Sequence, residues 1–268
     1  MQSVFRKHVT LVPQYFRLAR SREAEYKVGF YTFLLNQIIS ISVWLVFWRI
    51  LMDNFGPFGS WSYKHVVLLT GFVAINGGLW LTFIAVWRLP VEILTGALNS
   101  HLIKPVQPFV HVVFKSLNLR SFPRILMGVA IIVYGIVHFD LPYDVISIVL
   151  AILTSMLSFL SVFIPLAMIG LSAFWIGRAE FLRDLFVELL IFQNYPLTEF
   201  PNPFILVFTF ILPLIFAGTV PVLILTLNFS IWKSLLILLL LIVIVVGQLL
   251  LFRAVWNRGL RRYESYGG

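Results

Sequence analysis

The sequence predicts an all-α membrane protein with one domain, residues 1–268, six transmembrane helices and cytoplasmic N- and C-termini. Hydrophobic residues make up 60% of the chain and charged residues 12%, and the mean hydropathy is +0.96. Long apolar runs separate the charges, which are mostly basic and leave a net charge of +9. Because an ordinary soluble domain carries about 25% charged residues, this composition excludes a water-soluble fold.

The first element, residues 1–27, is expected to stay in the cytoplasm. Between Val4 and Arg22 apolar residues fall on one side of a helix, and Arg6 and Arg17 lie towards the other. This pattern predicts an amphipathic helix on the inner leaflet surface. The alternative is a frayed basic tail, because Pro13 is unfavourable inside a helix. The segment is too charged for a cleavable signal peptide, so we expect the first span to act as its own insertion signal.

Apolar runs between charges locate the membrane spans, because a helix needs about 20 mainly apolar residues to cross the hydrocarbon core. Five runs are long enough, and a shorter sixth gains a turn if the Arg124 side chain snorkels to the interface. The predicted spans are Val28–Trp48, Val66–Trp87, Ile125–Val137, Val145–Ile176, Phe204–Leu227 and Leu235–Phe252.

The distribution of basic residues predicts the orientation of these spans. With the N-terminus inside, 17 of the 20 Lys and Arg residues fall in the cytoplasm, and Arg49, Lys64 and Lys233 fall outside. Cytoplasmic loops collect Lys and Arg in this way. The basic excess therefore indicates orientation and contact with membrane lipid, and no nucleic-acid partner is expected.

The connector over residues 178–202 allows two interpretations. Glu180 to Gln193 is amphipathic and carries four charges, which favours a helix on the inner surface. Alternatively, this stretch crosses the membrane. Phe204–Leu227, which contains Pro213 and Pro221, would then become a re-entrant hairpin on the outer side.

The largest predicted cytoplasmic loop, residues 88–124, contains a short helix of its own. Val91 to Leu102 shows helical spacing of apolar residues, begins after Pro90 and ends before Pro105. Loops of this length are uncommon unless they are functional. The helix is either a docking element for a cytoplasmic partner or a helix that rests on the membrane surface.

Motifs for catalysis are missing from the sequence. There is no G-x-x-x-x-G-K-[ST] loop to hold ATP phosphates, no H-E-x-x-H zinc motif, no G-x-S-x-G nucleophile elbow and no cysteine. His101 and His111 share the cytoplasmic loop, but their spacing makes a weak metal site. We assign no catalytic residue and no metal ligand, and expect the chain not to be an enzyme.

Polar residues within the predicted spans are amides and hydroxyls, and none is ionisable. This argues against proton- or ion-coupled transport, which uses ionisable groups at mid-membrane. Asn76 and Gln248 are expected to form hydrogen bonds between helices rather than to contact a substrate. Gly71, Ala74 and Gly78 predict a close-packing seam on the second span.

Several short motifs, in their order and spacing relative to the spans, resemble a known family. They are Gly96-x-Leu98 with Leu102-Ile103-Lys104-Pro105, Tyr195-Pro196 followed by Phe200, the pair Pro213 and Pro221, and Trp256 with Arg262-Tyr263-Glu264-Ser265 before Gly267. Over nearly its whole length the chain resembles the membrane subunit of type-2 ABC exporters, and specifically a bacterial subfamily of these permeases.

The resemblance implies a half-transporter in the bacterial inner membrane. Such a subunit dimerises with itself or with a sister permease and binds two copies of a separate ABC ATPase, which holds ATP and Mg; this chain itself would hold no cofactor. In the family, the helix between the second and third spans sits in a cleft of the ATPase and transmits its closure. Carried onto this sequence, that coupling role falls on apolar anchors and polar rim contacts: Val91, Glu92, Leu94, Leu98, Leu102 and Lys104. The family shares no substrate motif, so the cargo stays open. The alternative function is a channel or scaffold subunit that is not driven by ATP.

Overall fold

The computed structural model describes residues 13–21, 27–104, 107–177 and 180–263. Apart from an isolated bridge between Phe58 and Trp61, the regular structure in these ranges is helical. Five helical stretches are long and apolar enough to cross a membrane: Val28–Phe55, Tyr63–Thr82, Leu119–His138, Val145–Ile176 and Ile231–Arg262. They confirm the first, second, third, fourth and last of the predicted spans as helices of sufficient length.

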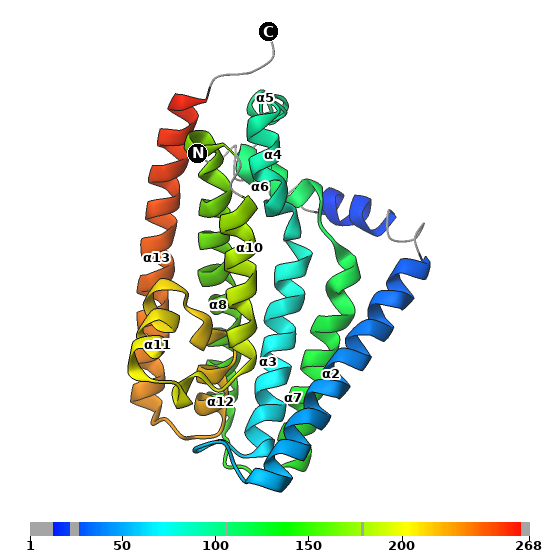
Figure 1. Cartoon of the computed structure of the whole chain (residues 1–268), viewed down its shortest axis with the longest axis vertical. Helices are drawn as coiled ribbons and strands as arrows, with labels where there is room; N and C mark the ends of the chain where they lie inside the picture. Colours follow the sequence, from blue (N-terminus) through cyan, green and yellow to red (C-terminus); the bar gives the residue numbers. More distant parts are fainter. Residues whose placement is uncertain (1–12, 22–26, 105–106, 178–179, 264–268) are drawn as a thin grey trace.

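These stretches correspond to named helices in the structure. The helices are α2 (Lys27–Phe55), α3 (Tyr63–Thr82), η2 (Leu119–Ser121) with α7 (Phe122–His138), α8 (Val145–Leu171) with α9 (Ala173–Ile176), and α13 (Ile231–Arg262). Pro123 in the first turn of α7 is compatible with a helix start, so the third stretch begins earlier than predicted and reaches spanning length. Figure 1 shows α3 in the middle of the bundle, with α7 and α2 on one side and α10, α8 and α13 on the other.

The helices α3 and α7 pack at backbone distance along a glycine seam. A Cβ built on Gly71 would lie 2.6 Å from the Ile132 side chain, and one built on Gly128 would lie 2.6 Å from the Gly71 carbonyl oxygen. Gly78 continues the seam against Ile125. Small residues allow such an approach because no side chain separates the two backbones. The predicted packing role of Gly71 and Gly78 is therefore confirmed.

Asn76 joins three elements of the core. Its Nδ2 donates to Ser155 Oγ at 2.8 Å and to the Ala217 carbonyl at 3.1 Å, and its Oδ1 accepts from Ser158 Oγ at 3.0 Å. Gln248 of α13 likewise donates to the Ser161 carbonyl of α8 at 3.2 Å. Both amides thus form the interhelical hydrogen bonds that the sequence predicts.

The predicted fifth span, Phe204–Leu227, is wrong as a continuous helix. The structure divides the region into α11 (Asn202–Leu206), the π-helix η5 (Val207–Ile211), η6 (Leu214–Ala217) and α12 (Thr219–Leu225). Pro213 separates η5 from η6, Pro221 lies in the first turn of α12, and the residues from Leu214 to Ala217 are buried in the protein. The second half of the region, η6 and α12, packs against α8 and α3, whereas most apolar side chains of α11 and η5 are exposed. Figure 1 shows the region folded back in the lower half of the molecule.

The segment that precedes this region, residues 180–199, runs alongside α3. It consists of α10 (Glu180–Leu189) and η3 (Leu190–Asn194), followed by η4 (Leu197–Glu199). Near its start the Arg183 guanidinium lies 5.6 Å from the Trp87 ring, beyond the C-terminal end of α3. Near its end Trp61 Nε1 donates to Thr198 Oγ1 at 3.0 Å, just before α3 begins. The segment therefore extends from the level of Trp87 to that of Trp61, which is the length of α3.

The helix over residues 13–21 lies at one end of the bundle, together with the C-terminal end of α13 (Figure 1). It runs across the direction of the long helices, and Ala19 is buried. This orientation agrees with the predicted surface helix for residues 13–21. The rest of that prediction, from Val4 to residue 12, lies outside the described residues.

Candidate functional site

The loop over residues 88–124 forms three short helices at the same end of the bundle. They are α4 (Leu89–Leu94), α5 (Asn99–Leu102) and α6 (Pro108–Lys115), preceded by η1 (Ile84–Arg88). The predicted single helix from Val91 to Leu102 is therefore wrong. Gly96, at φ 75°, breaks it into α4 and α5, because this left-handed conformation is unfavourable for residues with a Cβ.

A buried cluster, the loop core, holds these helices on the bundle. Its members come from the loop and from the end of α8 with α9: Leu89, Ile93, Leu98, Val112, Leu171, Ala173 and Phe174. From α13, Trp256 and Tyr263 pack against the Phe174 ring at 6.3 and 5.9 Å, and Gly259 leaves the space that this ring needs. The loop is thus packed directly on two of the long helices.

The structure separates the predicted anchors into two groups. Leu98 is fully buried in the loop core, so in this structure it holds the loop and is not available to a partner. The exposed apolar side chains are Val91, Leu94 and Leu102 together with Ile103, which is 85% exposed. We call these four residues the loop patch. The motif Leu102-Ile103-Lys104-Pro105 contains Ile103, but helical spacing alone did not select it.

The predicted polar contacts, Glu92 and Lys104, both have partners within the loop. Glu92 Oε2 lies 3.2 Å from His101 Nε2, and Lys104 Nζ donates to His111 Nε2 at 2.8 Å. His111 Nδ1 also pairs with the Tyr15 hydroxyl, which links the helix over residues 13–21 to α6. These contacts tie the loop to itself and to the N-terminal helix.

The pKa of His111 is lowered to about 4, first by burial and then by the nearby Lys104, His101 and Lys115 side chains. A neutral ring agrees with the hydrogen bonds, because Lys104 can only donate and Nε2 must therefore accept. The proton then sits on Nδ1, which donates to the Tyr15 oxygen. Near neutral pH the neutral His111 ring therefore holds Lys104 and Tyr15 in position through these two hydrogen bonds.

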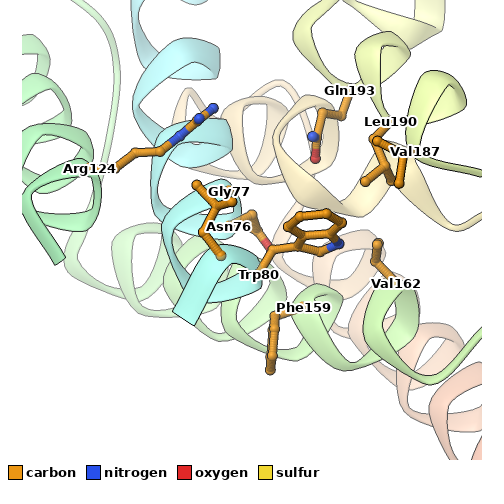
Figure 2. A pocket seen from close by; sticks show the side chains of 10 residues that line it. Asn76, Gly77, Trp80, Arg124, Phe159, Val162, Val187, Leu190 and Gln193 are labelled. Atoms are coloured by element: carbon orange, nitrogen blue, oxygen red, sulfur yellow. The ribbon is translucent and has the colours of Figure 1, made fainter. Parts of the chain in front are cut away.

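A cavity of about 170 Å³ lies deeper in the bundle, between α3, α7, α8 and the α10–η3 segment. Its lining is mostly apolar, and includes Trp80, Phe159 and Leu190, with Asn76 and Gln193 as uncharged polar residues. Figure 2 shows the Arg124 side chain reaching from α7 across α3 beside Gly77, with Gln193 on the far side and Trp80 between. Arg124 thus turns inward and does not snorkel outward as the sequence analysis assumed.

Comparison with known families identifies the family of this chain. A family model described as ABC-2 family transporter protein matches residues 38–267. The chain belongs to this family. It is accordingly a multi-pass membrane protein and the permease component of an ABC transporter. Searches of curated proteins and of solved structures find no match.

Proposed function

We propose that this ABC-2 family permease is the membrane subunit of an ATP-driven exporter in a bacterial inner membrane, and that its loop patch docks on a separate ATPase. The observation that carries the proposal is the loop patch itself, which exposes four large apolar side chains on helices packed against the bundle. Exposed apolar clusters outside the lipid region are typical of protein interfaces. A chain without a phosphate-binding loop needs such a partner to use ATP.

The loop core supports a mechanical role for this contact. Because Leu98 and Ile93 pack against Leu171, Ala173 and Phe174, a displacement of α4 and α5 acts directly on the end of α8 and on α9. The contacts of Phe174 with Trp256 and Tyr263 extend the cluster to α13. Closely packed interiors transmit displacement with little compression. Closure of the ATPase would therefore move α8 and α13 together.

We further propose six crossings, with the α10–η3 segment as the fifth. It runs beside α3 from the level of Trp87 to that of Trp61. Three of its four charges, Glu180, Arg183 and Asp184, lie at the end that adjoins the loop, and Glu188 lies further along. The region over residues 202–227 then forms a re-entrant hairpin on the outer side, with both termini of the chain in the cytoplasm. The basic residues support the same orientation.

The assembly proposed from the family is a permease dimer with two ATPase copies. The two permease subunits are either identical or a sister pair, and each presents one loop patch to one ATPase. ATP and Mg would bind to the ATPase subunits.

Co-purification tests the docking proposal. Affinity-tagged chain, purified from membranes of its native host, should retain an ABC ATPase. Replacement of two loop-patch residues, Leu94→Asp and Ile103→Asp, should remove the ATPase and the ATP hydrolysis that accompanies the permease. Phe55→Asp is the matched control. Phe55 is 86% exposed at the C-terminal end of α2, at the end of the bundle away from the loop patch, so this variant should leave the complex intact.

Two results would reject the exporter. If no ABC ATPase accompanies the wild-type chain, or if the double variant keeps ATPase and hydrolysis at the wild-type level, the chain is better described as a channel or scaffold subunit. Leu98→Asp is not a suitable docking variant, because a charge at this buried position would disrupt the loop core itself.

Reporter fusions test the topology. A reporter after Lys104 should be cytoplasmic, and reporters after Pro57 and Tyr143 should be external. A reporter after Glu199 decides the fifth crossing: it should be external if α10–η3 spans the membrane, and a cytoplasmic signal there would refute that crossing.

A further inference from the structure

The cavity beside Arg124 has two nitrogen donors, Arg124 Nε and Trp80 Nε1, that lack a hydrogen-bond partner within the described residues. Arg124 Nε and Trp80 Nε1 are sealed from solvent and form no hydrogen bond within the described residues. Both groups are donors only, and neither can satisfy the other. The side chain of Gln193 also lines the cavity and offers a further polar group.

Nothing in the cavity lining neutralises the guanidinium. None of the lining residues is acidic, and most are apolar. An arginine stays charged inside proteins, and the Arg124 side chain is half-buried with its Nε shielded from solvent, so its partial burial without a paired anion is unfavourable. The cavity therefore lacks an acceptor with negative charge, such as a phosphate or a carboxylate, to which a guanidinium donates strong hydrogen bonds.

Gly77 shapes the site for this side chain. A Cβ at this position would lie 2.8 Å from Arg124 Nε and 2.9 Å from its Cζ. The guanidinium thus rests directly on the α3 backbone, where any larger residue would displace it. The sequence places a glycine where the inward orientation of Arg124 requires one.

The depth and size of the cavity select the kind of anion. Gly77 is five residues before Thr82, the end of α3, which is about 8 Å along a helix. With the end of α3 taken as the level of the membrane surface, this depth corresponds to the boundary between headgroups and acyl chains, where amphipathic groups settle. The volume of about 170 Å³ is close to that of a cavity that holds one benzene molecule, so it admits a headgroup but not a whole lipid.

We propose that the Arg124 cavity binds the anionic headgroup of a lipid-like amphiphile, with Arg124 as the anion ligand and Trp80 as a second donor. The rest of the amphiphile would lie against the apolar lining and the surrounding membrane. The binding site follows from the bundle alone. The inference that this cavity binds the cargo during transport rests on the proposed function.

Lipid binding to the full-length chain in detergent tests this proposal. Native mass spectrometry should show phosphatidylglycerol retained with about tenfold or greater preference over phosphatidylcholine, as expected for one charge-assisted contact. Phosphatidylglycerol with brominated acyl chains should quench tryptophan fluorescence. Most of that quenching should be lost in Trp80→Phe, which locates the bound lipid beside Trp80.

Variants of the anion ligand provide the second arm. Arg124→Gln should remove the preference for phosphatidylglycerol, and Gly77→Ala should weaken it by displacing the guanidinium. Arg253→Gln is the control for charge, because Arg253 is an exposed arginine on α13 and does not line this cavity. Arg253→Gln should bind phosphatidylglycerol as the wild type does.

Three results would overturn the proposal. They are equal retention of the two lipids by the wild type, undiminished preference in Arg124→Gln, and competition by inorganic phosphate at the same concentration as phosphatidylglycerol, which would make the ligand a free anion. If Arg124→Gln fails to fold, the lipid preference and the phosphate competition of the wild type still test the proposal. If no ABC ATPase co-purifies but lipid binding still depends on Arg124, the exporter proposal is rejected and the lipid-binding proposal stands.

Discussion

Replacement of Gly128 by alanine should separate α3 from α7. The new Cβ would lie 2.6 Å from the Gly71 carbonyl oxygen, 2.8 Å from the Ile75 Cγ1 and 2.8 Å from the Ile75 backbone nitrogen. Non-bonded carbon atoms make contact at about 3.5 Å, so these atoms overlap the added methyl group. Two of the three belong to the backbone and cannot rotate away. The helices must therefore move apart by about 1 Å, which forfeits a quarter to a half of the dispersion energy along the opened seam.

The expected cost follows from two opposing effects. Overpacking typically costs about 1–3 kcal/mol, and the gain in helix propensity from glycine to alanine offsets about 1 kcal/mol of this. The difference is about 0–2 kcal/mol, so Gly128→Ala should lower the free energy of unfolding by about 1 kcal/mol, and its Tm by about 3 °C at the scaling known for chains of this size.

Thermal unfolding of the detergent-purified chain, followed by tryptophan fluorescence, measures this effect. Gly247→Ala on α13 is the matched control, because no atom lies within 4 Å of the Cβ that it would add. The control should keep or raise the wild-type Tm. If Gly128→Ala is as stable as Gly247→Ala, the helices do not approach along this seam and the packing argument fails.

Three further predictions concern the core and the loop. Asn76→Ala removes three hydrogen bonds to other elements, each worth about 0.6 kcal/mol in a membrane protein, and should lower the free energy of unfolding by about 2 kcal/mol; an unchanged denaturation midpoint would contradict this. Gly259→Val would place a Cβ 2.3 Å from the Phe174 ring, so limited proteolysis should cut the 88–124 loop faster than in the wild type while the bundle stays intact. Because the pKa of His111 falls from 6.5 to about 4 on folding, the unfolded chain binds more protons between these values, and stability should decline as the pH falls from about 6.5 to 4. His111→Gln should flatten this decline in a series of unfolding midpoints, and an equally steep decline in the variant would assign it to other groups.

The long spans were predictable because spanning length and apolar composition are local properties of the chain. The α3–α7 seam was also visible in the sequence, since Gly71 and Gly78 recur on one helix face. The fifth crossing was not predictable in this way. Apolar residues between Phe204 and Leu227 satisfy the same test as a lipid-facing span, yet those from Leu214 to Ala217 are buried against protein.

The loop shows the same division. Pro90 and Pro105 marked the helical region, and helical spacing identified Leu94, Leu98 and Leu102 as apolar positions. Spacing did not reveal that Gly96 would turn the chain, or that Leu98 would face α9 while Ile103 faces outward. Which side chains are exposed depends on the elements that pack against the loop.

The sequence by itself determined that this protein is a helical membrane protein and the approximate positions of five spans, since each depends on composition along a short stretch. Only the tertiary structure decided that α10–η3 runs beside α3, that the region over residues 202–227 folds back, and that Arg124 points into a cavity. These features arise from contacts between residues far apart in the chain, such as Trp61 with Thr198 and Gly77 with Arg124. A hydropathy pattern does not distinguish burial in protein from burial in lipid.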